Sequence, residues 1–134
     1  MRSTKIITSF IKYDDKFLLL KRSDKVKTMR GLWGGISGII EGDETALERA
    51  KIEIFEEVKI KESDIKLLKS TDMIRVESPQ YKNHEWEIFP FLFETTNPQI
   101  RLNWENSEFK WIIPDDLSNF ETVPSLDKVL AYLI

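Results

Sequence analysis

The chain has 134 residues, contains no cysteine and contains one histidine, His84. The absence of cysteine excludes a disulfide framework, a thiolate zinc site and a cysteine nucleophile, and the single histidine excludes a histidine-rich metal site. No segment approaches the apolar length of a membrane span, and the N-terminus lacks the apolar stretch of a signal peptide. We therefore expect a cytoplasmic protein without a membrane segment.

A strong excess of positive charge is also missing, since the formal net charge is −3. This balance argues against a general nucleic-acid-binding surface. The length suits one domain of ordinary size with a real core, and the composition is that of a globular protein. We expect a single domain over residues 1–134.

The apolar and polar pattern predicts alternating strands and helices. We expect strands at residues 5–13, 16–22, 65–76, 85–95 and 109–113. We expect a helix capped by Asp43 or Thr45 and running to about Val58, a helical turn from Pro114, and a terminal helix at residues 125–134. Pro79, Lys82 and Asn83 indicate a loop. The order predicts an α/β fold, a mixed sheet with helices on both faces.

The expected 45–58 helix has two faces. Its buried stripe consists of Ala46, Leu47, Ala50, Ile54 and Val58. Beside that stripe, Glu53, Glu56 and Glu57 fall within an arc of about 100°. Like charges at this spacing destabilise a helix by roughly 0.2–0.5 kcal/mol per pair. Acids in the last turn also oppose the helix dipole, at roughly 0.3–1 kcal/mol each. Three glutamates alone indicate a solvated acidic face.

The segment before this helix favours a different interpretation of the acids, because a glycine-rich turn leads into it. The glycines of that turn are Gly34, Gly35, Gly38 and Gly42. Carboxylate oxygens gathered at one place favour a hard cation such as Mg²⁺ or Mn²⁺.

Residues 38–60 resemble the box motif of the Nudix family (MutT-like). The matching positions are Gly38, Glu44, Glu53, Ile54, Glu56, Glu57 and Ile60. Two positions depart, because Ile52 stands where the family has arginine and Lys59 where it has glycine. Upstream, residues 33–38 resemble the family's Trp-x-x-Pro-Gly-Gly sequence, with Ile36 for proline and Ser37 for the first glycine.

The resemblance implies a Nudix α/β/α sandwich and Mg²⁺-dependent hydrolysis of a phosphoanhydride bond in a nucleoside diphosphate linked to a group X. The implied metal ligands are Glu53, Glu56, Glu57 and the Gly38 carbonyl. Glu53 is one candidate for the general base. Glu105 is the other, because it lies six residues before Trp111, a spacing similar to the family's loop glutamate; an ordinary loop acid is the alternative.

The two departures from the motif carry their own expectations. Arg49 stands four residues before Glu53, and we hypothesise that it replaces the missing arginine; a plain surface arginine is the alternative. Lys59 is expected to remove the left-handed helix terminus that glycine would supply.

Binding of substrate phosphates requires donors, and a basic stretch follows the second expected strand. Its members are Arg22, Lys25, Lys27 and Arg30. Arginine suits phosphate, although a basic surface loop is equally consistent. Trp33, Tyr81, Trp86 and Phe89 could stack on a base or belong to the core. Arg22, Arg30 and Trp33 are the candidate substrate-binding residues.

The sequence leaves three interpretations open. The first is a pyrophosphohydrolase acting on a nucleoside triphosphate or a nucleotide derivative, with that small nucleotide as its partner. The second is a non-catalytic nucleotide-binding module with a drifted motif. The third is a helix that is acidic for solubility alone. Ile52 and Phe55 lie off the buried stripe and hint at the apolar contact of a homodimer.

Overall fold

A computed structural model gives the fold and describes residues 2–78 and 81–134. The loop expected at Pro79 falls partly outside the described residues. The strands are β1 (Arg2–Tyr13), β2 (Lys16–Arg22), β3 (Trp33–Gly34), β4 (Ile36–Ile39), β5 (Ile65–Ser70), β6 (Ile74–Glu77), β7 (His84–Thr95) and β8 (Asn106–Ile112). The α-helices are α1 (Ala46–Val58) and α2 (Leu126–Leu133), and short 3-10 helices cover Glu62–Asp64 and Pro114–Asn119.

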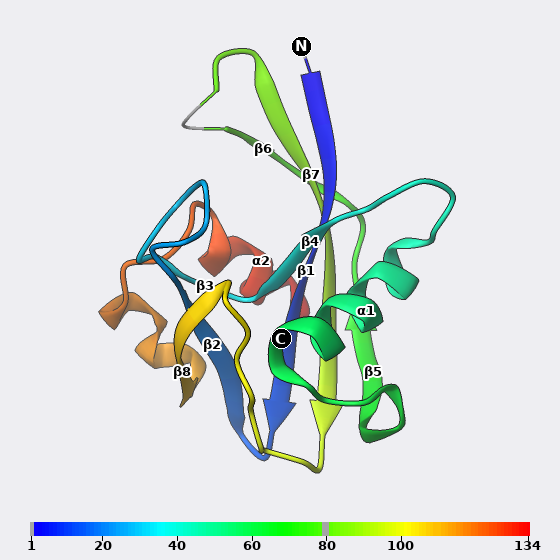
Figure 1. Ribbon diagram of the computed structural model, residues 1–134, viewed down its shortest axis with the longest axis vertical. Coiled ribbons are helices and arrows are strands. Elements are labelled where there is room, and N and C mark those ends of the chain that lie inside the picture. The colour runs from blue at the N-terminus through cyan, green and yellow to red at the C-terminus, as the bar shows by residue number, and fades with distance from the viewer. Residues whose placement is uncertain (1, 79–80) are drawn as a thin grey trace.

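The described strands form one mixed sheet around β1 and β7, which run side by side in Figure 1. The order β3-β2-β1-β7-β5 forms its main path, while β4, β6 and β8 pair with β1, β7 and β2 respectively. β1 and β7 pair in parallel from Arg2↔His84 to Lys12↔Glu94, whereas the other strand pairs are antiparallel. The expected mixed sheet is therefore confirmed.

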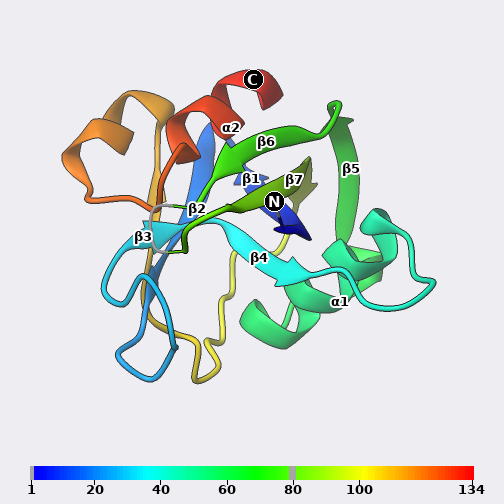
Figure 2. The ribbon, with the colours of Figure 1, turned by 90° about the horizontal axis from the view of Figure 1, so that it is seen from above.

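Two apolar clusters hold helices against opposite faces of this sheet, as Figure 2 shows from above. Along β1, Ile7 and Ile11 face the cluster that contains α1, while Phe10 faces the cluster that contains α2. This follows from the alternation of side chains along a strand. The central strands are apolar on both faces, and the α/β/α arrangement buries both. In the described part of the chain, no helix combines the length and apolar character needed to cross a membrane.

The start of α1 is fixed by a capping box. The Thr45 hydroxyl accepts a hydrogen bond from the Glu48 backbone N–H at 3.1 Å, and the Glu48 carboxylate accepts one from the Thr45 N–H at 3.2 Å. Thr45 rather than Asp43 is thus the N-cap. The expected buried stripe is confirmed, since Ala50, Ile54 and Val58 are fully buried and the first turn packs partly on the same cluster.

Two strand expectations were wrong. The stretch 65–76 forms β5 and β6 instead of one strand, because β5 pairs with β7 from Phe91 onward and β6 pairs only up to Ile88. Pro90 lies in the gap and has no N–H for a ladder. Within the glycine-rich segment, residues 33–34 form β3 and residues 36–39 form β4 rather than a turn. β4 lies antiparallel to β1, with Gly38 opposite Ile7.

The end of α1 also differs from expectation, because Lys59 itself adopts the left-handed conformation (φ 62°, ψ 32°). Its backbone N–H donates to the Phe55 carbonyl at 3.0 Å, so the helix terminus that glycine would supply is kept. A side chain in this region costs roughly 1–2 kcal/mol. The end of α1 is therefore strained where the family's glycine would not be.

We expect Lys59→Gly to raise the free energy of unfolding by about 0.5–1 kcal/mol, because glycine relieves the left-handed strain. Urea denaturation at low protein concentration measures this. Lys59→Ala is the matched control, since it removes the same side-chain head but keeps a Cβ. Equal stability of the two variants would contradict the strain explanation.

Candidate active site

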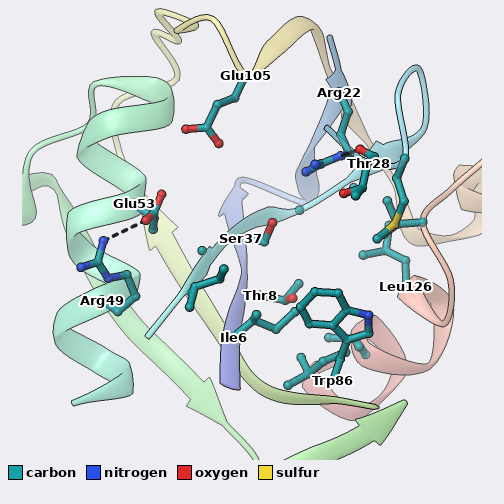
Figure 3. A pocket seen from close by; sticks show the side chains of 18 of the residues that line it. Ile6, Thr8, Arg22, Thr28, Ser37, Arg49, Glu53, Trp86, Glu105 and Leu126 are labelled. Atoms are coloured by element: carbon teal, nitrogen blue, oxygen red, sulfur yellow. Dashed lines mark hydrogen bonds and ion pairs between the residues drawn. The ribbon is translucent and has the colours of Figure 1, made fainter. Parts of the chain in front are cut away.

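A cavity of about 590 Å³ lies beside α1 and has two chemically different ends. Figure 3 places Glu53 and Glu105 at one end, with Arg22 facing them, and Ile6, Trp86 and Leu126 at the other. Hydroxyl side chains of Thr8 and Ser37 lie between the ends. The cavity can therefore hold a molecule that is anionic at one end and apolar at the other.

The acidic end is a cluster of Glu53, Glu57 and Glu105, in which one carboxylate oxygen of each lies within 4.8 Å of the others. Glu53 and Glu57 are one helical turn apart on α1, and only 7% and 3% of their surfaces are exposed. Glu105 is half-buried and comes from the loop before β8. Burial of several carboxylates together is costly unless protons or cations neutralise them.

Glu57 is the most deeply buried member of this acid cluster. Burial raises its pKa well above the ordinary value, and the charges of Glu105 and Glu53 raise it further. Its Oε1 accepts a hydrogen bond from the Asn106 amide at 3.1 Å, which opposes the rise. Its Oε2 is buried without a hydrogen-bond partner among the described residues. That oxygen has no donor among the described residues and is available as a ligand atom.

Glu53 is held in place by Arg49. The Arg49 guanidinium donates to Glu53 at 3.0 Å and to Glu44 at 2.5 and 2.9 Å, so it fixes the Glu53 carboxylate from the N-terminal side of the helix. Burial raises the pKa of Glu53, and the bond from Arg49 opposes that rise. The bond to Glu44 raises the pKa of Arg49, so the guanidinium stays charged.

Gly38 on β4 leaves room for the Glu53 carboxylate. A Cβ at position 38 would lie 2.4 Å from the Glu53 Cδ and Oε2 atoms, a distance that real contacts do not allow. The strand backbone and the carboxylate therefore touch only because residue 38 has no side chain. The packing places the Gly38 backbone at the acid cluster.

The acid cluster fits a hard divalent cation. It offers oxygen ligands only, one of them buried and without a partner within residues 2–78 and 81–134, and its negative charges repel one another. Glu53, Glu57 and Glu105 could hold such an ion. Glu56, expected as a ligand, is exposed and lies outside this three-residue cluster, although it lines the cavity.

Of the three expected substrate-binding residues, the structure places one at the cavity and two away from it. Arg22 lines the cavity, its Nε donates to the Thr28 carbonyl at 3.2 Å, and burial lowers its pKa while Glu57 and Glu105 raise it. Arg30 is exposed, donates to the Val26 carbonyl at 2.6 Å and does not line the cavity. The Trp33 ring packs edge-on against Phe120, 5.1 Å between centroids, and does not line the cavity either.

Some residues of the site were not predicted from the sequence. Asn106, the hydrogen-bond donor to Glu57, was not singled out, although its position directly after Glu105 could have suggested it. Of the apolar end, the sequence singled out Trp86 alone, as a ring that could stack on a base, because the other residues come from separate elements and look like ordinary core positions. Its members are Ile6, Val76, Trp86, Ile88, Leu126 and Val129.

We expect Arg49→Ala to lower kcat by about 10- to 100-fold with little change in KM, because Glu53 loses the donor that orients it. Arg49→Lys, which keeps the charge without the planar fork, should lie between the variant and the wild type. Steady-state kinetics with a nucleotide substrate measure both. An unchanged kcat in the alanine variant would show that Arg49 is only a surface residue.

A mixed sheet between helices, with three acids from α1 and the loop before β8 gathered at the anionic end of a cavity, defines a protein of the α/β/α class whose site suits a divalent cation. The chain belongs to the Nudix family, because the model for the NUDIX domain matches residues 4–133. The family and the fold predicted from the sequence are thus confirmed, and membership makes the chain a pyrophosphohydrolase.

Relatives and solved structures agree with this assignment. The chain is 25% identical over 135 residues to nucleoside triphosphatase NudI of Escherichia coli. This alignment covers 97% of this chain and 96% of the relative. The MutT protein of Methanosarcina mazei Go1 superposes with a TM-score of 0.77 at 20% identity, over 98% of this chain and 92% of that one. The C. elegans Ap4A hydrolase superposes with a TM-score of 0.75 at 18% sequence identity, over 98% of this chain and 93% of that one. At such identities the structures show the fold alone.

Proposed function

We propose that the chain uses Mg²⁺ or Mn²⁺ to hydrolyse a phosphoanhydride bond in a nucleoside triphosphate or another nucleoside diphosphate derivative. The observation that supports this most is the convergence of Glu53, Glu57 and Glu105 at one end of a cavity whose other end is apolar. The name of the E. coli relative, a nucleoside triphosphatase, points to the same substrate class.

Glu53 and Glu57 would hold the cation, with the Gly38 carbonyl and Glu56 next to them as further oxygen donors, while Glu105, the third member of the cluster, would stay unligated. When bound, a divalent cation neutralises phosphate charge and lowers the pKa of a water ligand. The rigid helix sets the spacing of Glu53 and Glu57, and Arg49 fixes the orientation of Glu53.

Glu105 is our candidate for the group that takes the proton from the attacking water. It is half-buried at the end of the cavity, and its nearest hydrogen-bond donor, the Asn103 amide, lies 3.4 Å away. Glu53, the other candidate, already accepts a bond from Arg49 and is almost fully buried. A base must be reachable by water and free to accept a proton, which favours Glu105.

Arg22 is the candidate phosphate donor, because it is the arginine that faces the acid cluster across the cavity in Figure 3. Its Nε bond to the Thr28 carbonyl leaves the two terminal nitrogens for phosphate oxygens. The apolar end then receives the nucleoside against Trp86 and Leu126. Arg30 and Trp33 have no role in this arrangement.

A panel of nucleoside triphosphates and diphosphate derivatives, assayed for phosphate and pyrophosphate release with Mg²⁺, tests the proposal. We expect turnover by the wild type, and Glu105→Gln should lower kcat by about 100-fold or more while nucleotide binding persists. Nucleotide binding by the wild type without turnover would support the binding module instead. Neither binding nor turnover would support a helix that is acidic for solubility alone.

Other expectations from the sequence stay predictions. These are the cytoplasmic location, the single domain over residues 1–134 and the lack of a nucleic-acid partner. The substrate within the nucleotide class is the first result that the panel would supply.

A further inference from the structure

A face of α1 next to the active site carries apolar side chains that the described chain leaves partly uncovered. Ile52 is 40% exposed and Phe55 is 48% exposed, and they border a shallow hollow that Leu47 also lines. Apolar side chains gathered in this way and rimmed by charges indicate a contact surface. Glu48, which also lines this hollow, and Lys59 lie on either side of the two apolar residues along the chain and are exposed.

These four side chains form a seam along the helix. At about 100° per residue, Glu48, Ile52, Phe55 and Lys59 fall within an arc of about 60°. Their spacing of four, three and four residues is that of the contact positions in paired helices. Lys59 follows the last helical residue but stays on this face, because its Nζ lies 5.3 Å from the centroid of the Phe55 ring.

We propose that a second copy of this chain docks on this seam, with the two α1 helices antiparallel across a two-fold axis. A dyad between residues 53 and 54 places Ile52 against the partner's Phe55 and Glu48 against the partner's Lys59. The symmetry repeats each contact, so the interface has two apolar pairs at its centre and two opposite-charge pairs at its ends.

Charge complementarity selects the antiparallel arrangement. A parallel pair would place Glu48 against the partner's Glu48 and Lys59 against the partner's Lys59, which is repulsive at both ends. Glu48 and Lys59 cannot satisfy each other within one chain, because eleven residues of helix separate them by about 16 Å. Lys51, at the flank, already pairs with Glu62 at 2.9 Å.

The interface is small, since two short helices bury less than the roughly 1,200 Å² of a standard complex. We therefore expect a weak dimer with a Kd of about 10–500 µM. The inference does not depend on the proposed catalytic role of any residue.

Sedimentation equilibrium from about 5 µM to about 1 mM, which brackets the expected Kd, tests the dimer. Phe55→Glu should weaken association by about tenfold or more, because it buries a charge at the centre of the seam. Phe109→Glu is the matched control: this phenylalanine is 40% exposed on β8, outside the seam, and its variant should associate like the wild type. A monomeric wild type, or equal weakening by both variants, would overturn the proposal.

A charge exchange tests the antiparallel register. Glu48→Lys and Lys59→Glu should each weaken the dimer by about fivefold or more, because each creates two like-charge pairs. The double variant restores opposite charges and should return to within about threefold of the wild type. It still lacks the capping glutamate, so recovery cannot come from the helix cap. Failure of the double variant to recover would overturn this arrangement.

Discussion

Replacing Glu57 by glutamine is expected to abolish turnover and yet to stabilise the protein without metal. The substitution removes the buried carboxylate whose Oε2 has no partner in the described chain. Turnover should fall by more than about 100-fold, because even residues that only orient metal ligands contribute about 10- to 100-fold. The amide should raise the free energy of unfolding by about 1–3 kcal/mol, since its N–H can donate to Glu53 or Glu105.

The loss of turnover in Glu57→Gln concerns the metal-loaded protein, whereas the gain in stability is expected without metal and depends on pH. Burial raises the pKa of Glu57 above its ordinary 4.5, so the folded protein binds this proton more tightly than the unfolded chain. The stability of the metal-free wild type should therefore fall as pH rises above about 4.5, and the gap to the variant should widen. Thermal unfolding with EDTA or Mg²⁺ measures this. If Glu57→Gln is less stable than the wild type in EDTA, the buried Glu57 carboxylate is not an uncompensated charge and the explanation is wrong.

The second large effect is expected from Gly38→Ala, which should lose more than about 100-fold in kcat while the fold persists. The new methyl group would meet the Glu53 carboxylate at 2.4 Å, and the carboxylate is the part that can move. Displacement of a reacting group by about 1 Å can cost about 100-fold. Titration with Mn²⁺, followed by paramagnetic relaxation of water, should show weaker binding at the same time.

Gly42→Ala is the matched control for Gly38→Ala. A Cβ at position 42 meets no atom within 4 Å, but the backbone there has φ +55°. This variant should lose about 1 kcal/mol of stability and keep its activity. Gly38→Ala should instead lose its activity and keep most of its stability. Full activity in Gly38→Ala would mean that the position of the Glu53 carboxylate does not matter.

Much of the fold was predictable because it depends on local patterns. The stripe through Ala50, Ile54 and Val58 has a helical period, and the apolar runs at 5–13 and 16–22 have the length of strands. β4 was missed because glycine and serine have little strand propensity, and its pairing with β1 supplies what the sequence lacks.

The candidate site was predictable only in part, for a similar reason. Helical spacing alone brings Glu53, Glu57 and Arg49 together, since all three lie on α1. The pairing of β8 with β2 is what places Glu105 beside them. Nothing in the local sequence separates Arg22, which lines the cavity, from Arg30, which does not.

The sequence by itself determined the family, the acid-bearing helix and the spacing of its carboxylates, because these depend on residues within a few turns of one another. Tertiary structure alone decided which acids meet, which are buried and what lines the apolar end of the cavity. Those properties depend on distances between elements far apart in the chain, and only the packing of both helices on the mixed sheet sets them.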